Sequence, residues 1–350
     1  MKKLLVFTVF CLILAGCAPA GTSQYLLLGR SAPISGITAP LDGTPTAVPN
    51  GTLPAAPTAT LIPTAAPAAQ SVLPNFDHII LIMLENRGFK SVFGADTTQM
   101  PFLNTLATGN VVLTNYFAVA HPSLPNYIAL MSGSTQKITQ DCTDCFVNQP
   151  NLADEIEASG RTWKAYLEGM PSACFVGNAG AYAQKHDPLL YFDSIRLNAA
   201  RCDRSIVPLT TLNGDLANNQ LPNFSLITPN LCDSGHDCSA ATADQWINDM
   251  VTKLQASPAL GENYLIIIAF DEAGSNDKSS CCGLPTAAGG QVAVVLISPS
   301  ALPDMSDNTS YDHYSLLKTI LTAWNLPLLG QTALPSTLAI TSPWTGLPDK

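Results

Sequence analysis

Two uninterrupted apolar runs constrain this chain more than any other feature. Residues 78–84 read His-Ile-Ile-Leu-Ile-Met-Leu, and residues 264–270 read Tyr-Leu-Ile-Ile-Ile-Ala-Phe. Short runs rich in β-branched residues, without alternating polar positions, are typical of strands buried on both faces of a parallel sheet. Because such a sheet needs helices on both faces, these runs predict an α/β fold.

Strand and helix patterns alternate along the rest of this region. Further strands are predicted at residues 111–117, 162–167, 224–228 and 291–297, and helices at residues 151–160, 242–254 and 314–324. The helix over 151–160 ends at a glycine, and the helix over 242–254 has one apolar side. This alternation predicts a three-layer α/β sandwich with a mostly parallel central sheet, formed by one domain over residues 76–350.

The first sixteen residues predict a lipoprotein signal peptide. Lys2 and Lys3 precede an apolar run over residues 4–14, which is too short to span a bilayer comfortably. The segment Leu-Ala-Gly-Cys that ends at Cys17 resembles the lipobox of bacterial lipoproteins. That resemblance implies cleavage before Cys17, lipidation of its thiol, and an anchor on the extracytoplasmic side of a bacterial membrane. An ordinary signal peptide with a chance cysteine is the alternative.

Residues 17–75 are predicted to be a disordered tether rich in Ala, Pro and Thr. From residue 18 to residue 76 the only charged side chains are those of Arg30 and Asp42. Dense proline blocks helices and sheet ladders, and small side chains bury little apolar area. The segment would hold the catalytic domain away from the membrane. A small folded module is the alternative.

The charge of the chain excludes one class of partner. The formal net charge is −10, and removal of Lys2 and Lys3 with the signal peptide would make the chain more acidic. No stripe of basic residues is present, so a nucleic acid is not expected as a partner. An anionic substrate would need a bound metal to attract it locally.

The cysteines agree with export. The predicted domain holds an even number, which outside the cytoplasm usually indicates disulfides. Closeness in the sequence favours the pairs Cys142–Cys145, Cys174–Cys202 and Cys232–Cys238. The adjacent Cys281 and Cys282 would need either a vicinal bridge or separate partners. A zinc site at Cys142 and Cys145 is disfavoured, because no second pair of ligands follows at zinc-like spacing.

Polar side chains follow three of the predicted strands directly. They are Glu85 and Asn86, Asp271 and Glu272, and Asn230 and Asp233. Sites in open parallel sheets form beyond the carboxyl ends of the strands, and carboxylates crowded there repel one another unless a cation holds them. Oxygen ligands favour a divalent calcium, magnesium or manganese ion, and nearby histidines leave zinc or iron open. Polar loops and helix caps are the alternative for each pair taken singly.

A candidate nucleophile lies in the segment from His121 to Tyr127, which reads His-Pro-Ser-Leu-Pro-Asn-Tyr. Ser123 precedes an apolar segment with Pro125 near its first helical position. The hydroxyl would therefore lie at a helix N-terminus, where backbone N–H groups favour a phosphate. Metal coordination would activate the hydroxyl. A helix-capping role alone is the alternative.

Four of the five histidines lie in polar, loop-like contexts, whereas His78 opens a strand and is expected to be structural. The four are His121, His186, His236 and His313. Several histidines beside acidic residues suggest metal ligands, a phosphate donor and a general acid.

Five segments together resemble the bacterial phosphoesterase family, which includes non-specific phospholipases C and secreted acid phosphatases of the alkaline-phosphatase-like superfamily. The resemblance is carried, in the family's order, by Glu85–Phe89, by His121–Tyr127, by Asn230–Asp237, by Phe270–Glu272 and by His313–Ser315. From the first segment to the last, the resemblance extends along nearly all of residues 76–326. The resemblance implies an alkaline-phosphatase-like fold.

The resemblance also implies roles for named residues. Metal binding is expected of Glu85, Asn86, Ser123, Asp271 and Glu272. Catalysis is expected of Ser123 as nucleophile, with His236 and His313 at the phosphate or the metal. We further expect substrate binding by His121, Asn126 and His186.

The predicted activity is metal-dependent hydrolysis of phosphate monoesters through a phosphoserine intermediate. The substrate would be a small phosphate ester or a phospholipid headgroup. Gly88, where the family's phospholipases usually have Ser, and the lack of their C-terminal modules favour acid-phosphatase-like or phosphoinositide-phosphatase-like members. A phospholipase C-type phosphodiesterase and a non-catalytic surface binding protein are the alternatives. The sequence leaves the oligomeric state open.

Overall fold

The computed structural model describes residues 73–94, 97–285 and 288–345. The predicted signal peptide, Cys17 and all but the last three residues of the predicted tether lie outside the described residues. Within these ranges, no helix combines the length and the apolar character that crossing a membrane requires.

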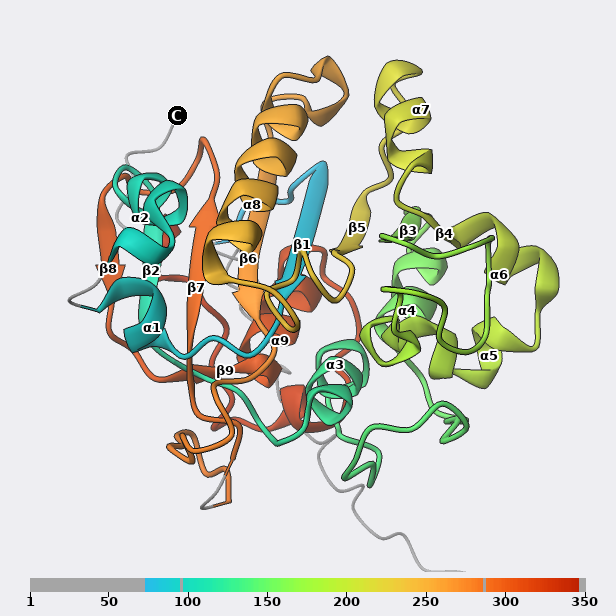
Figure 1. Ribbon diagram of the computed structural model, residues 1–350, viewed down its shortest axis with the longest axis horizontal. Helices are drawn as coiled ribbons and strands as arrows, with labels where there is room; N and C mark the ends of the chain where they lie inside the picture. The colour runs from blue at the N-terminus through green and yellow to red at the C-terminus, as the bar shows by residue number, and fades with distance from the viewer. Residues whose placement is uncertain (1–72, 95–96, 286–287, 346–350) are drawn as a thin grey trace, which may run out of the picture. The chain divides into compact units, whose positions relative to one another are not determined.

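A mixed sheet forms the centre of the described region (Figure 1). The strands run in the order β4-β3-β5-β1-β6-β7-β2-β8, and β9 also pairs with β2. Their bounds are β1 His78–Leu84, β2 Val111–Phe117, β3 Trp163–Leu167, β4 Ile206–Pro208, β5 Phe224–Thr228, β6 Tyr264–Phe270, β7 Gln291–Ile297, β8 Met305–Asp307 and β9 Tyr311–Asp312.

The two apolar runs are the central pair of the sheet. Strands β1 and β6 are parallel, with His78 opposite Tyr264 and Leu84 opposite Phe270. All their residues except the first of each strand are buried, because side chains on both faces meet helices. The predicted mostly parallel sheet is confirmed, with one exception. Strand β7 runs antiparallel to both β6 and β2, and its apolar pattern gives no information about direction.

Helices cover both faces of this sheet. Helices α2 and α8 contact each other and lie on the viewer's side in Figure 1, whereas α3 contacts both α4 and α9. The bounds are α1 Phe89–Phe93, α2 Pro101–Ala107, α3 Ser123–Ser132, α4 Leu152–Ala158, α5 Asp193–Arg196, α6 Ala199–Ser205, α7 Thr211–Ala217, α8 Ala240–Gln255 and α9 His313–Ala323.

Local signals explain where several helices begin. Helix α4 has a capping box, in which the Asn151 side chain accepts from the backbone of α4 and Asp154 bonds back to the Asn151 N–H. Ser239 caps α8, and Asp312 caps α9 by accepting the Ser315 N–H at 2.9 Å. Helix α9 therefore begins at His313, and this fixes the position of that histidine in the fold.

Four disulfides tie loops of the described region. They join Cys142 to Cys145, Cys174 to Cys202, Cys232 to Cys238, and Cys281 to Cys282. The three pairs favoured by sequence spacing are thus confirmed, and the adjacent cysteines form the vicinal bridge. The Cys232–Cys238 bridge closes the loop that carries His236, so this histidine is held by a short covalent ring.

Candidate active site

The site begins where the two central strands end. Because Leu84 and Phe270 are opposite each other, the residues that follow them, Glu85 and Asp271, emerge side by side at the same edge of the sheet. Both side chains are fully buried. The backbone N–H of Asn86 donates to Asp271 Oδ1 at 3.0 Å, with Asn86 at a φ of 59°. Asparagine tolerates this left-handed conformation better than most residues.

Helix α3 brings the candidate nucleophile to this edge. Ser123 is the first residue of α3 and is almost fully buried. Its hydroxyl donates to Glu85 Oε2 at 2.9 Å and approaches Glu272 Oε1 at 3.4 Å. Residues that follow β1 and β6 therefore converge on the hydroxyl group at the first residue of α3.

The second oxygen of Glu85 is also contacted. The Tyr127 hydroxyl, one turn along α3 from Ser123, donates to Glu85 Oε1 at 2.5 Å. His186 Nε2 lies 3.1 Å from the same oxygen, without hydrogen-bond geometry, and its ring stacks on Tyr127. Burial raises the pKa of Glu85 to about 7, although Tyr127, Lys185 and Ser123 act in the opposite direction. Burial also lowers the pKa of His186 to about 4.

Asp271 has the least compensated carboxylate oxygen of the site residues that follow β1 and β6. Burial, with the neighbouring charges of Glu85 and Glu272, raises its pKa well above the ordinary value. Its Oδ2 is buried and has no hydrogen-bond partner among the described residues. An isolated buried carboxylate oxygen is costly.

A divalent cation would remove this cost, and the oxygen donors around Ser123 fit one. No three His, Cys, Asp or Glu side chains in the described ranges form a ready-made metal cage. The carboxylates of Glu85 and Glu272 contact Ser123, Tyr127 and His121. The site residues expected to bind metal nevertheless lie together at this edge of the sheet.

The four candidate histidines divide into two groups. His121 and His313 are held by hydrogen bonds on both ring nitrogens. His121 Nδ1 contacts Glu272 Oε2 and its Nε2 lies 2.9 Å from the Asp277 carbonyl. The bond to Glu272 raises the pKa of His121. His313 is fully buried, with Nε2 at 2.6 Å from the Asp271 carbonyl and Nδ1 at 3.0 Å from the Tyr116 hydroxyl.

His186 and His236 form the second group. Their rings lie 5.9 Å apart, and His236 is partly exposed, with Nδ1 at 2.6 Å from Asp237 Oδ1. His236, in the loop closed by Cys232–Cys238, therefore faces solvent on one side and adjoins the buried site on the other. His313 instead holds the backbone of Asp271.

Asn126, expected to bind substrate, is buried in the first turn of α3, and its side chain reaches back to the segment that precedes Ser123. Its Oδ1 accepts the N–H groups of Val119 and Ala120 at 2.9 and 3.0 Å, and its Nδ2 donates to the carbonyls of Ala120 and Pro122. The structure thus uses the amide to shape the backbone that presents the serine.

Two charged residues at the site carry no recognisable sequence signal. Asp141 Oδ1 accepts the Leu124 N–H at 3.0 Å, at the N-terminus of α3, and Asp141 Oδ2 pairs with Lys185 Nζ at 2.8 Å. Burial acts to lower the pKa of Lys185, but the bond to Asp141 and the charges of Glu85 and Asp271 outweigh it and raise this pKa. The positive charge of Lys185 therefore interacts with the buried carboxylates of Glu85 and Asp271.

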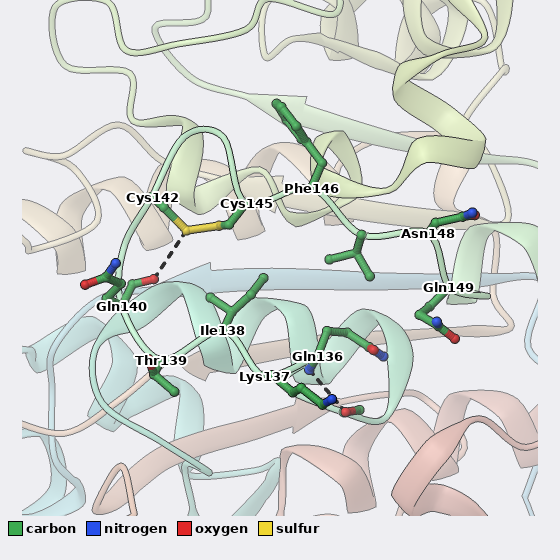
Figure 2. A pocket seen from close by; sticks show the side chains of 12 residues that line it. Gln136, Lys137, Ile138, Thr139, Gln140, Cys142, Cys145, Phe146, Asn148 and Gln149 are labelled. Carbon is green, nitrogen blue, oxygen red and sulfur yellow. Dashed lines mark hydrogen bonds between the residues drawn. A yellow bond between two sulfur atoms is a disulfide. The ribbon is translucent and has the colours of Figure 1, made fainter.

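Two pockets lie near the loop around Cys142. One, of about 420 Å³, is lined by Asp141, Lys185 and His236 and so adjoins the site. Figure 2 shows the other, of about 630 Å³, lined by side chains that include Gln136, Ile138 and Phe146. No hydrogen bond joins a lining residue of this second pocket to Ser123, Glu85 or Glu272 in the described part of the chain.

Solved structures show the same fold. A protein of the alkaline phosphatase superfamily from Vibrio parahaemolyticus aligns with a TM-score of 0.52 and 11% identity, over 76% of this chain and 72% of that one. A phosphonate monoester hydrolase of Agrobacterium radiobacter aligns with a TM-score of 0.52 and 11% identity, over 78% of each chain. At this identity the likeness establishes the fold alone, and it confirms the predicted fold class.

Sequence relatives are more specific. A phosphatidylinositol-3-phosphatase of Mycobacterium tuberculosis is 31% identical over 75% of this chain and 81% of its own length. A probable acid phosphatase of Kluyveromyces lactis is 31% identical and an acid phosphatase of Aspergillus fumigatus 30% identical, each over 73% of this chain. The chain spans 60% and 56% of the lengths of these two fungal relatives. The model of the Phosphoesterase family matches residues 96–327, most of the described region, and the chain therefore belongs to the Phosphoesterase family.

Proposed function

We propose that this chain hydrolyses phosphate monoesters with Ser123 as the nucleophile. One observation carries the proposal: the Ser123 hydroxyl, at the first residue of α3, donates to a buried carboxylate of Glu85 and adjoins a second one of Glu272. Membership of the Phosphoesterase family supports it. So do the names of the relatives, which are acid phosphatases and a phosphatidylinositol-3-phosphatase.

The first chemical step transfers the phosphoryl group to the serine. Ser123 Oγ forms a bond to phosphorus while the bond from phosphorus to the leaving oxygen breaks. The serine proton passes to Glu85 Oε2, which already accepts its hydrogen bond at 2.9 Å. His236, at the exposed side of the site, gives a proton to the leaving oxygen, so that a neutral alcohol departs.

The second step releases phosphate. Water attacks the phosphoserine and gives a proton to His236, the bond from phosphorus to Ser123 Oγ breaks, and the proton on Glu85 returns to the serine. Both residues regain their starting states. The N-terminus of α3 faces the reacting group and favours its negative charge.

A divalent cation is part of this proposal. Glu85, Asn86, Asp271, Glu272 and Ser123 would hold it, and the unpartnered buried Oδ2 of Asp271 supports the fit. When bound, such an ion would screen the carboxylates and lower the pKa of the serine hydroxyl. Calcium, magnesium or manganese suits the oxygen donors best, and zinc or iron suits the added histidines.

The test is hydrolysis of p-nitrophenyl phosphate by the full-length protein, beside bis(p-nitrophenyl) phosphate, after chelation and with single metals restored. We expect monoester turnover that chelation abolishes and one metal restores. Acid quenching during turnover should leave phosphate on the peptide that contains Ser123. Turnover of the diester alone would make the protein a phosphodiesterase of the phospholipase C type. No turnover with any metal would favour a non-catalytic binding protein.

We further propose that Cys17 anchors the domain outside the cytoplasm, at the bacterial cell envelope. The lipobox-like segment and the four disulfides support this placement. The variant Cys17→Ala should move from the membrane fraction to the soluble fraction and lose incorporation of labelled fatty acid. Unchanged fractionation of Cys17→Ala would contradict the anchor.

A further inference from the structure

The pocket of about 420 Å³ beside the site contains groups that the proposed chemistry does not use. Its lining includes Asp141, Thr143, Asn178, Tyr182, Lys185 and His236. Asp141 binds the N–H of Leu124, the residue after the nucleophile. His236 adjoins His186, which in turn lies 3.1 Å from Glu85. The pocket is therefore where the leaving group of a phosphate ester bound at Ser123 would extend.

The positive charges of this pocket are already compensated. Among the described residues, Lys185 is the only lysine or arginine in the lining, and its Nζ lies 2.8 Å from Asp141 Oδ2 and 3.2 Å from His236 Nε2. His236 in turn faces Asp237. A leaving group with its own carboxylate or second phosphate would meet no uncompensated cation here, and it would approach two carboxylates.

The pocket instead offers groups that suit hydroxyls. Asn178 uses its Oδ1 to accept the Gln184 N–H at 2.9 Å. Its Nδ2 and the hydroxyl of Thr143 make no hydrogen bond within the described residues, and both residues are exposed. Tyr182 and Leu231 add apolar surface. A few polar groups around a partly apolar wall are typical of sites that orient a small ligand, and the volume accommodates one sugar-sized ring.

We infer that this pocket binds the leaving group and favours an uncharged, polyhydroxylated one, namely a sugar or another polyol. This inference rests on the proposed function, since it assigns the substrate class of the same site. Thr143 and Asn178 are its specificity-determining residues, and Asp141 excludes anionic leaving groups by neutralising Lys185.

Steady-state kinetics on three esters tests it with the full-length, metal-restored protein. The esters are glucose 6-phosphate, 3-phosphoglycerate with its extra carboxylate, and p-nitrophenyl phosphate as the reference. We expect kcat/KM for glucose 6-phosphate to exceed that for 3-phosphoglycerate at least about tenfold. In the double variant Thr143→Val/Asn178→Ala, kcat/KM for glucose 6-phosphate should fall about tenfold, which is the effect of roughly one net hydrogen bond. The kcat/KM for p-nitrophenyl phosphate should stay unchanged.

Two further variants complete the test. Thr139→Val, in the second pocket that Figure 2 shows, is the matched control and should change none of the three rates. Asp141→Asn keeps an acceptor for the Leu124 N–H but removes the carboxylate that pairs directly with Lys185. It should shift the ratio of the two rates about tenfold toward 3-phosphoglycerate. A wild-type preference for 3-phosphoglycerate, or a ratio that none of these variants changes, would overturn the inference. Absent turnover of p-nitrophenyl phosphate by the wild type would instead count against the proposed function.

Discussion

The Ser123 hydroxyl lies 2.9 Å from Glu85 Oε2, although 38 residues separate the two positions in the chain. Glu85 follows the central strand β1 and Ser123 begins α3, so the contact joins the sheet edge to a helix N-terminus. Both residues are buried, at 0% and 1% exposure. The serine is therefore held between a helix and the end of a central strand, and such a preorganised arrangement suits the proposed catalysis.

Removing the Tyr127 hydroxyl should destabilise the protein. This hydroxyl donates to Glu85 Oε1 at 2.5 Å in a fully buried setting. In Tyr127→Phe, the carboxylate loses a donor that water cannot replace, and we expect the free energy of unfolding to fall by about 1–3 kcal/mol. Urea unfolding of the metal-free protein measures it. Tyr264→Phe is the control. The Tyr264 hydroxyl accepts a long hydrogen bond of 3.4 Å from Gln255 Nε2 in an exposed setting, so its removal should leave the free energy of unfolding nearly unchanged. An equal loss of stability in both variants would contradict a stabilising role for the hydrogen bond from Tyr127 to Glu85.

Substitution of His236 and substitution of His313, the two histidines expected at the phosphate, should have different effects on activity and stability. His236 is partly exposed, so His236→Ala should unfold like the wild type. In its proposed role as general acid, it should matter most for poor leaving groups. We expect the kcat for glycerol phosphate to fall about a hundredfold or more, and the kcat for p-nitrophenyl phosphate, whose leaving group needs no proton, to fall far less. Equal losses on both esters would remove His236 from this role.

His313→Ala should show the opposite behaviour. Its buried ring bonds the Tyr116 hydroxyl and the Asp271 carbonyl. Loss of these bonds and a new cavity should lower the free energy of unfolding by about 2–4 kcal/mol. Activity should fall by the same factor on both esters, because the buried His313 bonds the backbone of Asp271 and we expect it to act only by positioning that residue. A loss confined to glycerol phosphate would identify His313 as the acid.

Asp187 should give the stability a pH dependence. Burial raises its pKa from 3.8 to about 7. Between those values the folded protein holds a proton that the unfolded chain releases. The stability from the protonated group is therefore complete below about pH 4 and is lost as the pH rises through 7. Between pH 5 and pH 7.5 the free energy of unfolding of the wild type should fall by about 2 kcal/mol. The variant Asp187→Asn cannot ionise and should not show this fall.

Denaturant unfolding at both pH values measures this difference. Asp249→Asn, on the exposed side of α8, is the matched control and should follow the wild type. If Asp187→Asn showed the pH dependence of the wild type, Asp187 would not be the titrating group.

The sequence predicted the sheet well because its strands are defined by burial. The runs 78–84 and 264–270 coincide with β1 and β6, since a strand covered on both faces must be apolar throughout. The same reasoning could not predict that β7 is antiparallel, because an apolar strand reads alike in both directions. The meeting of Glu85 with Asp271 was predictable, because adjacent parallel strands deliver the residues that follow them to one edge.

Other parts of the site depend on tertiary contacts that leave no local pattern. Lys185 and Asp141 come from loops, and they meet only because those loops fold against the N-terminus of α3. The amide side chain of Asn126 is of a kind that often binds substrates. It instead makes four hydrogen bonds to the backbone of the segment before Ser123. His313 likewise follows an acidic residue in the sequence but lies inside the core. Spacing alone does not distinguish buried polar groups that shape the backbone from those that face a ligand.

The rate of p-nitrophenyl phosphate hydrolysis by Ser123→Ala tests the central claim most directly. Ser132→Ala is the matched control, since Ser132 is also buried in α3. Among the described residues its hydroxyl bonds to the backbone carbonyls of Ile128 and Ser134 and to Gln136, and to no carboxylate. With both variants folded, we predict that Ser132→Ala keeps its activity and that Ser123→Ala loses at least about a thousandfold in kcat. Turnover by Ser123→Ala within a few-fold of Ser132→Ala would show that another group is the nucleophile.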